Sequence, residues 1–208
     1  MAMDYLWTPW RYAYLIDDPG SPKGGRKGVP QALAAWPGDC DCVFCNLIAA
    51  TRFAVEHGMS PTDADRAANI VLRAEHNFIC LNAFPYSTGH VMIVPYAHQE
   101  SLTALELAAA LEMMVLARRT DTVLRQVYDP QGINLGLNLG QAAGAGIAAH
   151  LHMHALPRWF GDSNFMTVIA ETRVLPETLD VTWQRLREAF DQQISAVSEQ
   201  SQAPNPKS

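Results

Sequence analysis

The sequence predicts an α+β domain built on an antiparallel sheet of about five strands with two main helices. Apolar and β-branched runs of strand length follow one another with short turns between them. Two longer segments have the spacing of an amphipathic helix, and no βαβ unit repeats. The 208 residues, 49% of them hydrophobic, are enough for one sizeable core and too few for two.

Five segments have the length and composition of strands, and they are residues 77–84, 90–97, 133–139, 150–157 and 164–170. The first two flank the turn-forming sequence PYSTG, which predicts a hairpin. The predicted sheet therefore begins with a hairpin and ends with a strand that follows a histidine-rich segment.

Two segments have helical periodicity. Residues 101–128 contain no glycine or proline, and Ser101 is the predicted N-cap. The helical spacing places four apolar side chains on one face: Leu107, Leu111, Met114 and Val115. Residues 175–197 predict the second main helix.

Composition divides the chain into three parts. Residues 1–39 join an aromatic start, around Trp7 and Trp10, to a stretch rich in Gly, Pro and charge, which predicts an extended arm and a flexible linker. Residues 40–198 form the predicted folded domain, and the polar residues 199–208 form a disordered tail.

Charge and hydropathy exclude several classes of partner. The formal net charge is -6, and the scattered Lys and Arg residues form no broad basic face for a nucleic acid. No apolar run reaches membrane-spanning length, and the start lacks the basic-then-apolar order of a secretion signal. The sequence therefore predicts a cytoplasmic protein, and any nucleotide that it binds is expected to be small.

Three histidines in strict alternation carry the chemistry. On a strand, His150, His152 and His154 would project to one face, while their apolar neighbours project to the core. A single strand histidine is usually structural, but three in alternation can meet one phosphate group. Imidazole can attack phosphorus and titrates near neutrality.

A glycine-rich segment precedes the histidines. Gly140, Gly144 and Gly146 allow the backbone to approach an anion and to present N–H groups to it. Glycines before a strand usually mark only a turn. Their position directly ahead of the three histidines favours phosphate binding.

Residues 77–170 resemble the histidine triad (HIT) family, whose signature is His-x-His-x-His-x-x with apolar x. The resemblance implies a HIT-like fold, a homodimer whose sheet continues across the interface, and His152 as the nucleophile. His150 and His154 would orient it and contact phosphate, Asn82 would bind ribose, and Asn138 would lie near the ribose or the scissile phosphate. By the same resemblance, His90 is a structural hydrogen-bonder.

The sequence departs from the family just before the triad, where many members have Gly-Gln-Ser or Gly-Gln-Thr. Here the matching residues are Ala145, Gly146 and Ile147, none of which has a polar side chain. Only backbone N–H groups remain for phosphate, and the expected donors are Gly144, Ala145 and Gly146. Apolar hairpin residues, among them Phe78 and Leu81, would form the base pocket or, equally well, belong to the core.

The sequence CDCVFC has a spacing that suits a metal better than disulfides. In zinc-bearing relatives, two such cysteines join a histidine after the second hairpin strand and the first triad histidine. The resemblance thus implies a structural zinc site. Its ligands would be Cys42, Cys45, His98 and His150, with Cys40, His57 or His76 as substitutes and free reduced thiols as the alternative.

The resulting hypothesis is an enzyme that cleaves dinucleoside polyphosphates of the diadenosine tetraphosphate kind through a nucleotidyl-histidine intermediate. The branch most resembled is that of the bacterial diadenosine tetraphosphate phosphorylases. Phosphate is favoured over water as the acceptor because Ala145 and Gly146 open space and expose backbone N–H groups; Arg158 would add charge or be an ordinary solvated arginine. Alternatives are a nucleoside phosphoramidate hydrolase, a non-catalytic nucleotide sensor, and a hydrolase whose triad binds a catalytic ion. In the last case the outer histidines, roughly 13 Å apart on a strand, would reach one ion poorly.

Overall fold

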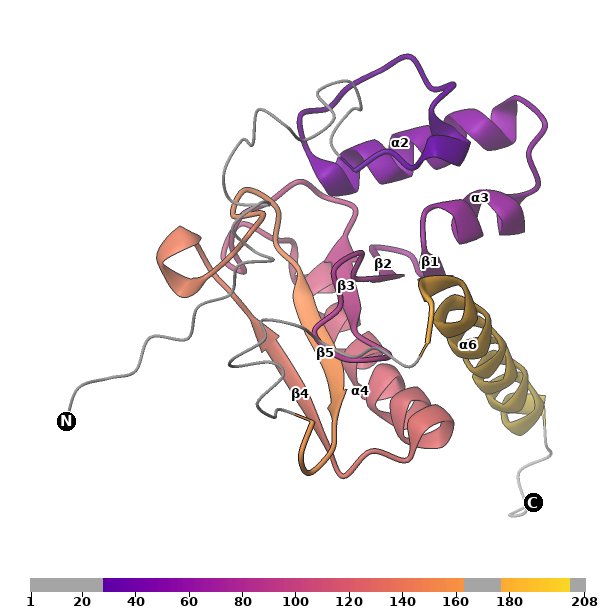
Figure 1. Ribbon diagram of the computed structural model, residues 1–208, viewed down its shortest axis with the longest axis vertical. Helices are drawn as coiled ribbons and strands as arrows, with labels where there is room; N and C mark the ends of the chain where they lie inside the picture. Colours follow the sequence, from indigo (N-terminus) through magenta and orange to yellow (C-terminus); the bar gives the residue numbers. More distant parts are fainter. Residues whose placement is uncertain (1–27, 163–176, 203–208) are drawn as a thin grey trace.

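The computed structural model describes residues 28–162 and 177–202, which form a five-stranded antiparallel sheet flanked by helices on both faces (Figure 1). The strand order is β1-β2-β3-β5-β4. The bounds are β1 Ile70–Arg73, β2 Asn77–Leu81, β3 Val91–Pro95, β4 Gly132–Leu137 and β5 Met153–Arg158. The predicted fold class, five-stranded antiparallel sheet and hairpin are confirmed.

Two strand predictions differ from the structure. The predicted strand at 164–170 lies outside the described residues. Strand β1 was not predicted, because its four residues are too short for a pattern and the first three are all buried. A strand covered on both faces loses the alternation by which strands are recognised.

The helices are α2 Val43–Glu56, α3 Pro61–Ala67, α4 Leu107–Tyr128 and α6 Leu179–Gln202. The two main helices, α4 and α6, are confirmed, whereas α2 and α3 were not predicted. Ser101 is not the N-cap of α4, which begins at Leu107 after Glu106. Instead, the Ser101 hydroxyl accepts the N–H of Ala104 at 3.3 Å in the preceding turn.

The sheet separates two hydrophobic clusters. One lies between the sheet and α4 and α6, and its large members include Met113, Leu116 and Phe190. The other lies under α2, where Phe44 and Leu47 pack on Phe78 of β2. In Figure 1, α2 and α3 lie above the sheet and α4 passes behind β3 and β5.

The second cluster reaches into the stretch that the sequence assigned to the linker. A single 3-10 turn, η1 Gln31–Leu33, places Leu33 in this cluster, and Trp36 is buried beside it. No helix in the described residues is long and apolar enough to cross a membrane.

One carboxylate fixes α4 to the β1–β2 turn. Glu112 accepts the backbone N–H groups of Glu75 at 3.0 Å and His76 at 2.9 Å, and the Asn77 side-chain amide at 2.8 Å. Three donors on one carboxylate are charge-assisted hydrogen bonds and give a defined register between helix and sheet.

The four apolar residues predicted on one face of α4 do share a face, but that face points away from the sheet. Leu107, Leu111, Met114 and Val115 are 72%, 59%, 59% and 57% exposed. The sheet is covered by the opposite face of the helix, which carries Met113 and Leu116. The exposed residues are called the α4 stripe below.

Candidate active site and metal centre

The three histidines project to the α2 side of the sheet. Leu151, Met153 and Ala155 belong to the cluster under α4, so the alternating histidines face the other way. The predicted alternation is therefore confirmed. Only His154 lies within β5; His150 lies in a bend, Leu151 and His152 belong to no strand, and Leu151 N–H donates to Gln99 O at 2.6 Å.

The surroundings of His152 select one of its two nitrogens as the reactive one. Its Nδ1 lies 2.8 Å from the backbone oxygen of His150. A carbonyl can only accept, so Nδ1 carries the proton and Nε2 keeps its lone pair. Burial lowers the pKa of His152, outweighing the hydrogen bond to the His150 carbonyl, which raises it. The ring is thus held neutral.

His154 has the opposite arrangement. The N–H of Tyr86 donates to His90 Nδ1 at 3.1 Å, so the neutral His90 ring carries its proton on Nε2. That nitrogen lies 2.9 Å from His154 Nδ1, which must accept. His154 therefore presents an N–H group at Nε2, and His90 is the structural hydrogen-bonder that sets this tautomer.

The two rings lie side by side. The centroids of His152 and His154 are 4.9 Å apart with their planes at 75°. Phe44 of α2 packs 5.2 Å from the centroid of His152 and supplies part of its apolar surroundings. The site therefore combines one nucleophilic nitrogen with one neighbouring hydrogen-bond donor.

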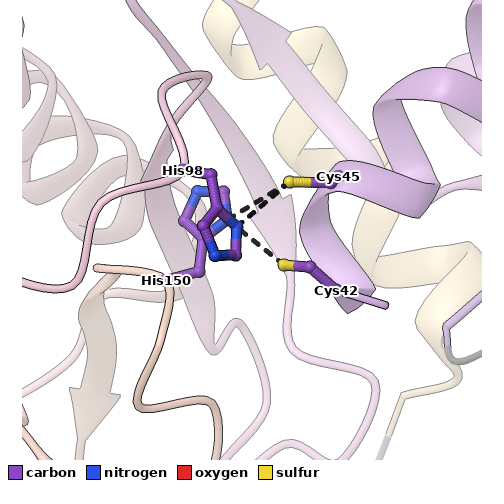
Figure 2. Close-up of side chains that lie close together, drawn as sticks. All are labelled: Cys42, Cys45, His98 and His150. Atoms are coloured by element: carbon purple, nitrogen blue, oxygen red, sulfur yellow. Dashed lines mark hydrogen bonds between the residues drawn. The ribbon is translucent and has the colours of Figure 1, made fainter. Parts of the chain in front are cut away.

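His150 belongs to a separate cluster with Cys42, Cys45 and His98 (Figure 2). One ligand atom from each of the four residues lies within 4.8 Å of the others. Cys42 Sγ is 3.3 Å and Cys45 Sγ 3.7 Å from His150 Nδ1, and Cys45 Sγ is 3.3 Å from His98 Nδ1. His150 Nε2 donates to Pro95 O at 2.9 Å, which directs Nδ1 to the cluster.

The chemistry of this cluster calls for a cation. Burial and the neighbouring Cys42 raise the pKa of Cys45 to about 12, so its thiolate is unstable without a positive partner. Burial lowers the pKa of His150 to about 4 and keeps its ring neutral, as a metal ligand must be. Two thiols and two imidazoles are a closed tetrahedral set suited to zinc.

The substitute ligands named from the sequence lie outside this group. Cys40 is exposed and does not belong to the four-residue set. His57 Nδ1 lies 2.7 Å from Phe53 O in its own helix, and His76 lies 3.8 Å from Glu75.

The expected nucleoside contacts fall on both sides of the sheet. Asn82 lies beside the triad, where its Nδ2 is 3.4 Å from His90 Nδ1 and its Oδ1 accepts the N–H of Phe84 at 2.9 Å. Of the two roles expected for Leu81, the core role is the one observed, because this residue is buried under α4 on the opposite face and so lies away from the base pocket. Phe78 is fully buried and lines a cavity of about 170 Å³ beside the metal cluster.

The glycine-rich segment folds back on itself through positive φ angles at Gly140 and Gly144, 82° and 88°. Ala145 is buried, and its N–H donates to Gly140 O at 3.3 Å, so this amide closes the loop rather than facing a ligand. Gly146 is exposed. Asn138, half-buried, stands between β4 and this loop.

Sequence reasoning missed two residues that position the triad. Phe44 lies on α2, and the sequence pattern did not separate this helix from the cysteine-rich loop in which it begins. Tyr86 lies in the hairpin turn, where the backbone N–H carries the role and the side chain gives no signal. The only sequence feature that indicates this role of the turn is the Gly-His pair at its end.

Comparison with known proteins agrees with this geometry. The family model described as "HIT domain" matches residues 64–161. A Mycobacterium tuberculosis protein called AP-4-A phosphorylase is 36% identical over 177 residues, which span 84% of this chain and 77% of that protein. The chain belongs to the HIT family. It is a nucleotide-processing enzyme of that family, as the predicted resemblance implied.

Solved HIT structures share the fold. A zinc-bound histidine triad protein from Mycobacterium smegmatis has a TM-score of 0.54 and 25% identity, and the match covers 74% of this chain and 96% of that one. A histidine triad nucleotide-binding protein from Sulfolobus tokodaii also has a TM-score of 0.54, at 22% identity, over 73% of this chain and 93% of that one. The predicted fold class, α+β with a HIT-like fold, is therefore the one that the structure has.

Proposed function

We propose that this HIT enzyme cleaves dinucleoside polyphosphates such as diadenosine tetraphosphate, with His152 Nε2 as the nucleophile and phosphate as the preferred acceptor. The observation that carries the proposal is the pairing of tautomers: a lone pair on His152 Nε2 beside an N–H on His154 Nε2. The relative called AP-4-A phosphorylase supports the substrate class.

In the first step, a bond forms between His152 Nε2 and the α-phosphorus, and the bond from that phosphorus to the bridging oxygen breaks. The nucleoside triphosphate leaves as an anion, and its new terminal oxygen accepts a hydrogen bond from the N–H at His154 Nε2, which keeps its proton. The charge that develops on the His152 ring is stabilised by the Nδ1–H hydrogen bond to the His150 carbonyl.

In the second step, an oxygen of inorganic phosphate attacks the same phosphorus and the N–P bond breaks. The proton of the incoming phosphate is released to solvent, and both rings are left in their starting tautomers. Diadenosine tetraphosphate and phosphate thus yield ATP and ADP. Asn82, beside the triad, is the proposed ribose ligand, and an adenine preference follows from the substrate proposed.

We also propose that zinc binds the cluster of Cys42, Cys45, His98 and His150. The zinc-bound relative from Mycobacterium smegmatis and the matching donor set support this. Bound zinc would stabilise thiolates and link α2 to the segment that carries the triad, which is a structural contribution. Such thiols need a reducing compartment, in keeping with the predicted cytoplasmic location.

Product analysis tests the acceptor. We expect added phosphate to accelerate diadenosine tetraphosphate cleavage and to give equal amounts of ADP and ATP, measured by anion-exchange chromatography. AMP with ATP at saturating phosphate would show hydrolysis and would contradict the phosphorylase proposal. Cleavage of adenosine phosphoramidate alone would favour a phosphoramidate hydrolase, and no cleavage of either would favour a nucleotide sensor.

We further propose a homodimer that buries the α4 stripe. Scattered exposed apolar residues are ordinary, but four on successive turns of one helix form a surface that water disfavours. Strand β4 lies at the sheet edge with one side of its backbone unpaired, which allows a second sheet to continue the first.

Light scattering is expected to give twice the chain mass for the native protein. The variant Leu111→Glu with Met114→Glu should shift it to the monomer mass, while Gln126→Glu, on an exposed turn of the same helix, should leave the dimer intact. A native protein that remains monomeric at micromolar concentration would contradict the proposal.

A further inference from the structure

The strand order constrains where the second half of a dinucleotide lies. Asn82 directly follows β2, and His152 and His154 lie just before and within β5. Strand β4 lies beyond β5 at the edge of the sheet (Figure 1). A substrate whose first ribose is at Asn82 and whose α-phosphorus is at His152 has crossed the sheet from β2 to β5. The next strand in that direction is β4.

We propose that β4 forms the subsite for the leaving polyphosphate, in which Asn134 binds phosphate oxygens and Gly136 keeps the path from the triad clear. This inference rests on the proposed function. Strand β4 would bind the nucleoside triphosphate, which is the part of the substrate that leaves with the bridging oxygen.

The register places both residues on the histidine face. Gly136 pairs with His154, and Asn134 pairs with Leu156, in an uninterrupted antiparallel ladder. Directly opposed residues of two strands project to the same face of a sheet. Asn134 and Gly136 are both exposed.

Gly136 has no backbone reason to be glycine. Its φ lies outside the left-handed range, and a Cβ built on it meets no atom within 4 Å. Glycine inside a strand costs roughly 0.5–1 kcal/mol relative to alanine and usually marks a bulge, a bend or the close approach of a ligand. The regular register excludes a bulge here. Because Gly136 is exposed and lies opposite His154, we take the close approach of a ligand as the reason for the glycine.

Asn134 has a fixed orientation. Its Oδ1 accepts Nη1–H of Arg158 at 2.9 Å, and Arg158 is itself held by both carboxylate oxygens of Asp162, at 2.5 and 2.8 Å. Because Arg158 has only donors, the amide oxygen faces it and Nδ2 presents two N–H groups elsewhere. Within the described residues Nδ2 has no acceptor.

The position of Asn134 and its lack of charge suit a subsite for the leaving polyphosphate. Asn134 lies two residues along the sheet from the level of His154, roughly 6.5 Å at strand rise, and four from that of His152. The leaving polyphosphate would therefore run from His152 past His154 to reach it. Neutral amide donors bind phosphate without holding it as strongly as free cations would, which permits release. Arg158, expected from the sequence to add charge directly, contributes instead by orienting Asn134.

Two substrates separate this subsite from the chemistry. Diadenosine tetraphosphate has a polyphosphate leaving group, whereas adenosine 5′-phosphoramidate loses only ammonia and cannot reach β4. For Asn134→Asp we expect kcat/KM to fall at least tenfold with the tetraphosphate and to stay within twofold with the phosphoramidate, because a carboxylate repels phosphate. Gln126→Glu introduces the same charge change on α4 and should change neither value.

Gly136→Val provides a second variant without a charge, and a β-branched residue suits a strand. It should show the same selectivity by blocking the path. Equal losses with both substrates, or no loss with either, in both folded variants would overturn the inference. If the wild-type protein cleaves neither substrate, the proposed function itself fails, an outcome distinct from loss of selectivity in the variants.

Discussion

Replacement of His152 by alanine is expected to lower turnover of diadenosine tetraphosphate by about 10⁴-fold or more, the scale seen when a covalent nucleophile is removed. The His152 ring is the only triad member that presents a lone pair to substrate through Nε2, since the first triad histidine faces the cysteines and the third presents an N–H. Nucleotide affinity should change little, because binding does not require the bond that this nitrogen forms.

Two measurements check this expectation. Mass spectrometry of the acid-sensitive adduct in a rapidly quenched reaction should find a nucleotidyl group on the peptide that contains residues 150–154, and the adduct should be absent from His152→Ala. As a control, Gln126→Glu, on an exposed turn of α4, should still form the adduct. Near-normal turnover by His152→Ala would remove the proposed mechanism.

Replacement of Cys42 by serine is expected to release the proposed zinc and to lower the melting temperature by roughly 10 °C. For a domain of this size, a loss of about 1 kcal/mol corresponds to roughly 2–4 °C, and a structural zinc site contributes several such units to folding. The buried Cys42 lies at the N-terminus of α2 and contacts His150, so the change detaches α2 from the triad segment.

Zinc analysis of freshly purified protein, together with a thermal melt, measures both effects. Cys40→Ser is the matched control, since Cys40 lies two residues away and outside the four-residue cluster; it should retain zinc and the native melting temperature. A native protein that contains no zinc would contradict the proposal, and Cys42→Ser with zinc retained would place the ligands elsewhere.

Several features were determined by local patterns that tertiary context did not alter. The period-two alternation at His150, His152 and His154 fixed their common face, although only His154 lies in β5. The uninterrupted helical stretch after Ser101 fixed α4, and the spacing of Cys42 and Cys45 identified two members of the four-residue cluster. Each of these signals comes from residues that are close together in the sequence. Over such short stretches the spacing alone determines which side chains share a face.

The faces of these elements were decided only by tertiary structure. The sequence could group the α4 stripe on one side of the helix but not tell that the opposite side covers the sheet, because periodicity gives a direction relative to the helix and not to its neighbours. For the same reason Leu81, assigned to the base pocket, lies under α4.

Contacts between distant segments were likewise beyond the sequence. Cys42 meets His150 across 108 residues, a pairing that family resemblance implied and spacing did not. The tautomer of His154 depends on Tyr86 and His90 in a hairpin turn, and the residue opposite it in the sheet, Gly136, comes from a neighbouring strand. Such arrangements arise when strands take their order in the sheet, and strand order depends on the free energy of the whole packed core rather than on any local pattern.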